Sequence, residues 1–139
     1  MSTQQFLFGQ EHVRRYQETD GDEGFVWKEG SRILLLTTTG RKTGKQTTTP
    51  LIFGLEGDTP VIVASQGGAP DHPGWYKNLV KNPAAEVQIK GEKFAVRARD
   101  AEGDGRERLW ELMNGEWRHY DEYQTRTDRR IPVVVLDRV

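Results

Sequence analysis

The chain has 139 residues, of which 35% are hydrophobic and 29% charged, and its formal net charge is −1. This length suffices for a domain with a hydrophobic core, and no stretch is apolar over the ~18 residues that a membrane-spanning helix requires. The near-neutral charge disfavours binding to nucleic acid, and the absence of cysteine excludes disulfides and thiolate metal sites. Residues 1–10 lack the basic and apolar segments of a secretory signal. We therefore expect a single cytoplasmic domain over residues 1–139.

The first 24 residues predict a helix followed by a linker. Residues 5–18 show helical spacing of their larger apolar side chains, and residues 19–24 are acidic and rich in glycine. Residues 25–27 (Phe-Val-Trp) form a short apolar island that either packs on the core or closes a ligand pocket.

A β-hairpin is predicted next. Residues 32–39 and 46–53 are rich in threonine and aliphatic side chains, and the turn between them is short. Pro50 indicates that the second strand lies at a sheet edge or carries a bulge, because proline has no N–H to donate.

The rest of the chain predicts more strands than helices. Asp71 is a candidate N-cap for the helix near residues 73–81, and residues 54–59 are predicted as a turn. Further strands are predicted at residues 60–64, 85–89, 93–99 and 131–136, and a second long helix at residues 104–117. About six strands, mostly joined by turns, and about three helices predict an α+β fold. We expect an antiparallel barrel with helices packed around it, not a doubly wound parallel sheet.

The turn of the hairpin is unusually basic. Gly40 and Gly44 bound a segment that holds Arg41, Lys42 and, one residue later, Lys45, and no acidic residue occurs between residues 30 and 55. Glycine allows backbone amides to turn toward an anion, so this loop is a candidate anion site. Its spacing does not match the nucleotide-binding P-loop. A solvated hairpin turn explains the composition equally well.

A second glycine loop, Ser65-Gln66-Gly67-Gly68, follows a predicted buried strand. It is either an ordinary turn or a second ligand loop to which Ser65 contributes its hydroxyl and N–H. Ser65 lacks the Gly-x-Ser-x-Gly elbow, which disfavours nucleophilic catalysis. Tyr120 and Tyr123 have helical spacing in a polar stretch and are candidates for the wall of a flat aromatic ligand.

The three histidines, His12, His72 and His119, are isolated from one another, so no metal site is expected and a surface or structural role is favoured.

In this order, the motifs resemble the deazaflavin-dependent nitroreductase family, whose members use coenzyme F420. The resemblance is carried by LLLTTTGRKTGK (residues 34–45), TPLIF (49–53), VIVASQGGAPDHPGWYKNLVKNP (61–83), Tyr120-x-x-Tyr123 and TDRRIPVVVL (127–136). It implies a split β-barrel related to the flavin-mononucleotide-binding oxidoreductases. It also implies a deazaflavin with a ribitol, a phosphate and an oligoglutamate tail.

The resemblance also implies roles for individual residues. The tail would contact Arg41, Lys42 and Lys45, and the tail and ribityl region would be lined by Thr43, Gly44, Thr49 and Pro50. The deazaflavin ring would lie beside Val63, Ala64, Ser65, Gln66 and Gly67. The helix on the phosphate side would be supported by Trp75, Tyr76 and Asn78. The substrate would be faced by Ser65, Tyr120 and Tyr123.

The implied activity is hydride transfer from reduced F420 to a small electron-poor acceptor, a quinone or a similar conjugated compound, with nitroaromatics as adventitious substrates. The family's nitroimidazole-activating type is similar but carries tyrosine and lysine where this chain has Phe53 and Gln66. The alternatives are a flavin-mononucleotide-dependent reductase on the same fold and a non-catalytic F420 carrier or sensor. A lipid quinone as acceptor would require peripheral contact with the inner face of the membrane, and a homodimer is compatible with the sequence.

Overall fold

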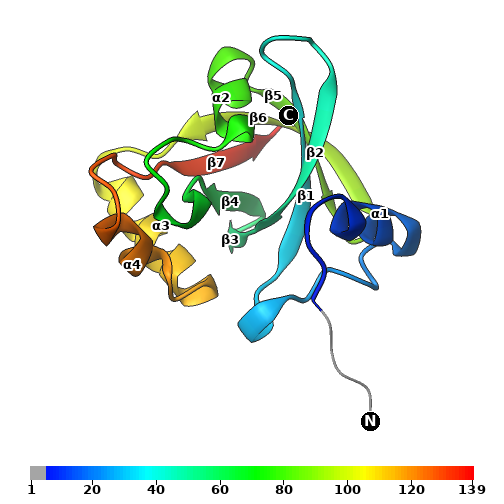
Figure 1. Cartoon of the computed structure of the whole chain (residues 1–139), viewed down its shortest axis with the longest axis horizontal. Coiled ribbons are helices and arrows are strands. Elements are labelled where there is room, and N and C mark those ends of the chain that lie inside the picture. Colours follow the sequence, from blue (N-terminus) through cyan, green and yellow to red (C-terminus); the bar gives the residue numbers. More distant parts are fainter. Residues whose placement is uncertain (1–5) are drawn as a thin grey trace.

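The computed structural model describes residues 6–139, which form one curled sheet with helices around it (Figure 1). The strands are β1 (Ile33–Thr39), β2 (Gln46–Ile52), β3 (Gly54–Glu56), β4 (Thr59–Val63), β5 (Ala84–Ile89), β6 (Glu92–Asp100) and β7 (Val133–Arg138). The α-helices are α1 (Gly9–Thr19), α2 (Gly74–Lys81), α3 (Gly103–Glu116) and α4 (Tyr120–Thr125), and two short 3₁₀ turns are η1 (Lys28–Gly30) and η2 (Gln66–Gly68).

The sheet is antiparallel throughout and nearly closes on itself. Its strand order is β2-β1-β5-β6-β7-β4-β3, so β2 and β3 are the two edge strands. Only Phe53 separates the end of β2 at Ile52 from the start of β3 at Gly54. Because one residue joins the opposite edges, the sheet has to curl until these edges approach each other, which produces a half-closed barrel.

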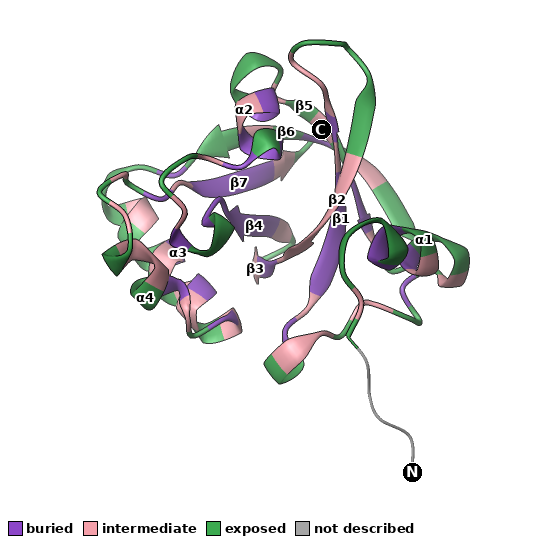
Figure 2. Cartoon of the chain, in the orientation of Figure 1, coloured by how far each residue is buried: buried purple, intermediate pink, exposed green. Residues whose placement is uncertain are grey.

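The alternation of side chains along β1 explains its continuous apolar sequence. Leu34 and Leu36 point into the barrel core, whereas Ile33 and Leu35 pack on the other side with Tyr16 of α1. β1 is thus buried on both faces, which favours an unbroken aliphatic run over an alternating one. β7 repeats this arrangement, with α3 and α4 covering its outer side, and Figure 2 shows both strands as largely buried.

Most of the expected elements are confirmed. The predicted hairpin corresponds to β1 and β2, which pair from Ile33 with Ile52 to Thr39 with Gln46. Pro50 lies in an edge strand, as its missing N–H indicated. The fold is α+β, a curled antiparallel sheet with helices around it.

Three local predictions were wrong. Residues 54–59 are not simply a turn, because Gly54–Glu56 forms β3 against β4. The N-terminal helix begins at Gly9 and not at residue 5, which lies outside the described residues. Trp27 Nε1 donates to the Leu7 carbonyl at 2.9 Å and keeps the segment around Leu7 extended. Asp71 does not cap α2: its carboxylate accepts from Lys77 Nζ at 2.6 Å instead.

Candidate functional site

A cavity of about 610 Å³ opens between α1, β2, the loop after β4 and the tyrosine-bearing helix α4. Within residues 6–139, no aspartate, glutamate, lysine or arginine lines it. Nine of the predicted site residues are among its walls, namely Thr49, Pro50, Val63, Ser65, Gln66, Gly67, Trp75, Tyr120 and Tyr123. An apolar and aromatic cavity with few polar groups is the usual character of a site for a flat organic ligand.

The Ser65 loop, residues 65–68, has an unusual backbone. Gln66, Gly67 and Gly68 all have positive φ, at 45°, 63° and 82°, whereas Ser65 is right-handed with φ −81° and ψ −40°. A right-handed residue followed by a left-handed one directs successive N–H groups to the same side, which favours an electronegative ligand atom. The Ser65 hydroxyl does not cap the turn and stays available to a ligand.

The two tyrosines of α4 differ in their hydrogen bonding. Tyr123 Oη accepts from Trp117 Nε1 at 3.2 Å, so the Tyr123 hydroxyl keeps its own proton for another acceptor. Tyr120 is almost fully buried, and its hydroxyl has no hydrogen-bonding partner in the described part of the chain. Burial raises the pKa of Tyr120, with smaller contributions from Tyr123 and Glu116, so the hydroxyl stays protonated at neutral pH.

The basic loop, residues 40–45, adjoins the cavity without lining it. Arg41 Nη1 donates to the carbonyl of Gly74, a cavity residue, at 3.4 Å and to Asn78 Oδ1 at 3.0 Å. Asn78 Oδ1 also accepts from the Arg41 N–H at 3.1 Å, and Asn78 Nδ2 donates to Thr38 Oγ1 at 3.1 Å. Asn78 therefore fixes the loop against α2, next to the mouth of the cavity.

Backbone amides contribute less to this loop than its glycines suggested. The amides of Gly40 and Gly44 donate to carbonyls inside the loop, at 2.7 Å and 2.9 Å, and that of Lys45 donates to Thr43 Oγ1 at 3.2 Å. The side chains of Lys42 and Lys45 are exposed. An anion at this loop would be held mainly by side-chain charge.

Besides the basic loop and Asn78, the two remaining predicted site residues, Ala64 and Tyr76, also lie outside the cavity. Ala64 is fully buried in the core, and its carbonyl accepts from Arg129. The Tyr76 hydroxyl donates to Asp100 Oδ2 at 2.6 Å on the far side of α2. Burial, together with this carboxylate, raises the pKa of Tyr76. Both residues support the elements around the site and do not line it.

The sequence reasoning missed several cavity residues on α1, α3 and the segments beside them. His12 is buried and lines the cavity, while its Nε2 lies 2.7 Å from the Gly24 carbonyl. Trp27 and Trp117 also line it, with ring centroids 5.7 Å apart. The apolar island at residues 25–27 was the one signal for Trp27, whereas nothing near His12 in the sequence points to a cavity.

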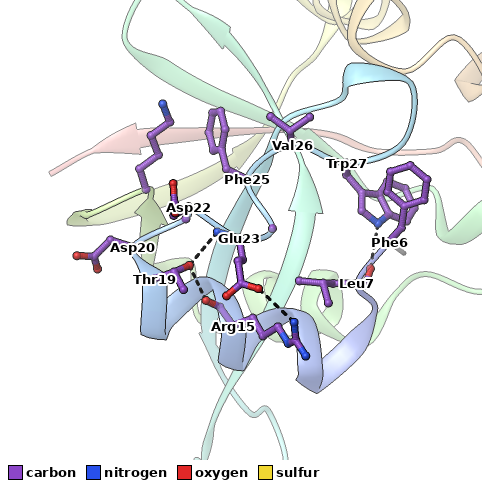
Figure 3. Close-up of a pocket in the computed structure, with 13 residues that line it drawn as sticks. Phe6, Leu7, Arg15, Thr19, Asp20, Asp22, Glu23, Phe25, Val26 and Trp27 are labelled. Carbon is purple, nitrogen blue, oxygen red and sulfur yellow. Dashed lines mark hydrogen bonds and ion pairs between the residues drawn. The ribbon is translucent and has the colours of Figure 1, made fainter. Parts of the chain in front are cut away.

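A larger cavity of about 870 Å³ lies between the end of α1 and the loop that follows it (Figure 3). Its charged lining is Asp20, Asp22 and Glu23 together with Lys90 and Arg15, and Arg15 is paired with Glu23 at 3.1 Å. The carboxylates outnumber the cations there, which disfavours a polyanionic ligand, and none of the predicted site residues lines this cavity. The charge-free cavity is therefore the better candidate.

No group of three or more histidine, aspartate or glutamate side chains within residues 6–139 could hold a metal ion. None of the helices in that part of the chain is long and apolar enough to cross a membrane.

The curled antiparallel sheet is that of the split-barrel reductases. A solved F420-H2 dependent reductase (FDR-A) superimposes with a TM-score of 0.71 at 43% identity, covering 76% of this chain and 93% of that one. A second solved chain, described as a domain-swapped dimer, has a TM-score of 0.74 at 39% identity and covers 90% of this chain and 96% of its own.

Sequence comparison narrows this class to one family. The family model of the F420H(2)-dependent quinone reductases matches residues 8–138. A Mycobacterium tuberculosis protein named F420H(2)-dependent quinone reductase is 42% identical over 130 residues, which are 91% of this chain and 87% of that protein. The chain belongs to the F420H(2)-dependent quinone reductase family.

Proposed function

We propose that this protein is an oxidoreductase that uses reduced coenzyme F420 to reduce a quinone, with nitroaromatic compounds as adventitious substrates. The observation that carries the proposal is the pairing of an uncharged aromatic cavity with a loop of three cations at its mouth. F420 has two parts that match these two features: a flat ring for the cavity and a polyanionic oligoglutamate tail for the basic loop.

The residues present fit this cofactor. The ring would lie in the cavity beside Val63 and the Ser65 loop, whose positive-φ backbone directs N–H groups to one side. The tail would leave past Gly74 toward Lys42 and Lys45, where no carboxylate of the sequence between residues 30 and 55 opposes it.

When bound, the reduced deazaflavin supplies a hydride. The side chains then have two tasks. The aromatic walls Trp27, Trp75 and Trp117 exclude water, which strengthens the remaining polar contacts. The hydroxyls of Ser65 and Tyr123 donate hydrogen bonds to the acceptor oxygen on which negative charge develops, and the Trp117 N–H keeps the Tyr123 proton pointing away from Trp117.

The tail assignment is tested by cofactor binding, using the intrinsic fluorescence of F420 preparations with different numbers of glutamates. Lys42→Ala should weaken binding more as the tail lengthens, and more at low salt, because exposed charges are screened within about 10 Å at 0.1 M salt. Lys42 suits this test better than Arg41, which is also bonded to Asn78. Lys93→Ala, an exposed lysine on β6, is the control and should have no effect. Equal affinity of the wild-type protein for tailed and tail-less cofactor would refute the assignment.

The rival functions are separated by two measurements. A flavin-mononucleotide-dependent reductase would bind that flavin more tightly than F420 in a parallel titration of the apoprotein. A carrier or sensor would bind F420 yet leave its reduced form unoxidised by a panel of quinones and nitroaromatic compounds. Turnover of reduced F420 with a quinone supports the proposal against both.

The location of the protein in the cell depends on where its electron acceptor is found. We place the protein in the cytoplasm, at the inner face of the membrane when the acceptor is a lipid quinone. The exposed apolar residues Phe8 and Val26, at 57% and 63% exposure, lie in or beside the segments that line the cavity and support this contact. Phe8→Ser should lower co-sedimentation with phospholipid vesicles, and unchanged co-sedimentation would contradict the placement.

The assembly we propose is a homodimer. Its support is the structurally similar chain described as a domain-swapped dimer. Light scattering after size exclusion should give about twice the 15.9 kDa mass of one chain, and a monomer mass at micromolar concentration would refute it.

A further inference from the structure

Arg129 contacts both ends of the Ser65 loop although it lies outside the cavity. Its guanidinium donates from Nη1 to the Ala64 carbonyl at 3.1 Å, from Nη2 to the Ser65 carbonyl at 2.7 Å and from Nε to the Ala69 carbonyl at 2.8 Å. Nη1 also lies 3.0 Å from His72 Nδ1. One side chain therefore links the segment before the loop to the segment after it.

Helix α4 fixes the backbone of Arg129 in turn. Gln124 of α4 donates from Nε2 to the Arg129 carbonyl at 2.8 Å and accepts at Oε1 from the Ile131 N–H at 3.0 Å. The loop also abuts α4 directly, because a Cβ on Gly68 would lie 2.5 Å from the Tyr123 carbonyl oxygen. The Ser65 loop and the tyrosine helix are thus held against each other by the Gly68 contact, by the Arg129 link and by Arg126 at the end of α4, whose Nη1 donates to the Gly67 carbonyl at 3.3 Å.

These contacts require arginine. A guanidinium is planar and carries five N–H donors in a fixed fork, whereas a lysine ammonium is a compact charge with three donors at one point. The acceptors around Arg129 surround it on more than one side and cannot all be reached from one point. Burial, and then the charge of Arg129, lower the pKa of His72, which keeps His72 neutral and able to accept this hydrogen bond at neutral pH.

We propose that Arg129 is a positioning residue of the reductase: it fixes Ser65 on its loop relative to Tyr120 and Tyr123 on α4, so that their hydroxyls meet the acceptor together. Its kinetic consequence rests on the proposed function, whereas the ordering of the loop does not. Arg129 touches neither the cavity nor the reacting atoms and acts through the carbonyls that it holds.

The test compares Arg129→Lys with Arg130→Lys, a matched change at the adjacent, exposed arginine. Amide hydrogen exchange of the peptide covering residues 63–70 should speed up in the first variant only. With reduced F420 and a quinone, kcat of Arg129→Lys should fall on the order of tenfold to hundredfold, with a smaller change in KM, because misplacing reacting groups by about 1 Å has effects of this size. Exchange and kcat that match those of the wild-type protein, or equal losses in both variants, would overturn the proposal.

A second variant covers the case in which Arg129→Lys does not fold. His72→Phe keeps the ring next to Tyr76, whose centroid lies 4.8 Å away, and removes one acceptor of Arg129. It should raise the exchange of the same peptide by a smaller amount, and unchanged exchange would overturn the proposal. Exchange needs no cofactor. A wild-type protein that does not oxidise reduced F420 with any quinone would therefore refute the proposed function, while the exchange data still decide the role of Arg129.

Discussion

Gly68→Ala is expected to destabilise the protein more than Gly67→Ala, although the two glycines are neighbours in the same loop. Both have positive φ, where a Cβ costs about 1–2 kcal/mol. A Cβ on Gly67 meets nothing within 4 Å, whereas one on Gly68 lies 2.5 Å from the Tyr123 carbonyl oxygen and 2.9 Å from Arg126 Cβ. Forcing an extra carbon into a filled site costs about 1–3 kcal/mol more. The expected losses are therefore about 1–2 kcal/mol for Gly67→Ala and about 2–5 kcal/mol for Gly68→Ala.

Urea unfolding followed by tryptophan fluorescence measures both losses, without cofactor, so that any role in binding does not enter. Gly74→Ala is the control, because a Cβ there meets nothing within 4 Å and φ is not in the left-handed region. It should leave the free energy of unfolding unchanged or slightly raised. Equal losses at Gly67 and Gly68 would mean that α4 moves aside readily, and would refute the tight contact between the Ser65 loop and α4.

Three further outcomes are expected. Tyr123→Phe should lower kcat with a quinone on the order of a hundredfold while F420 affinity is kept. Trp117→Phe, which removes the N–H donor to Tyr123 and shortens one aromatic wall of the cavity, should lower kcat less; steady-state kinetics and fluorescence titration check both. The pKa of His72 is lowered from its ordinary value of 6.5, so just below that pH the unfolded chain binds more protons than the folded one, and the stability of the protein should fall on acidification. The fall should be smaller in His72→Phe. Urea midpoints at about pH 7.5 and pH 5.5 measure it, and equal falls in both proteins would contradict this expectation. Tyr76→Phe removes the hydrogen bond to Asp100 and should cost about 1–3 kcal/mol in thermal unfolding; no loss would mean that water replaces the tyrosine hydroxyl as the donor to Asp100.

The strands were predictable where one segment carried its own signal. Residues Ile33–Leu36 are buried on both faces, so the composition alone indicated a strand. β3 was missed because Gly54–Glu56 has no strand composition and pairs only because β4 lies beside it. The helix start was misplaced because Leu7 is held by Trp27, which is distant in sequence.

The residues of the candidate site were likewise predictable only where they form a local sequence motif. Ser65, Gln66 and Gly67 form one local motif, and its position after a buried strand was enough to place them together. His12 reaches the cavity only because α1 packs against β1 and β2, which its isolated position in the sequence did not indicate. The Arg129 side chain forms its hydrogen bonds with residues at least 57 positions away, so no local sequence pattern could have indicated them.

β7 is the last of the sheet's strands in chain order, yet it lies in the interior of the sheet, between β6 and β4. Until it is in place, the hairpin of β3 and β4 has no partner on its other side, and β4 and β6 expose unpaired edges. Val61–Val63, which pairs with Val133–Val135, is short, β-branched and uncharged, the kind of segment that aggregates when left open. The chain can therefore complete its barrel only after β7 has been synthesised. Removing or blocking the final strand should cause misfolding of the β4 region, where the Ser65 loop is attached.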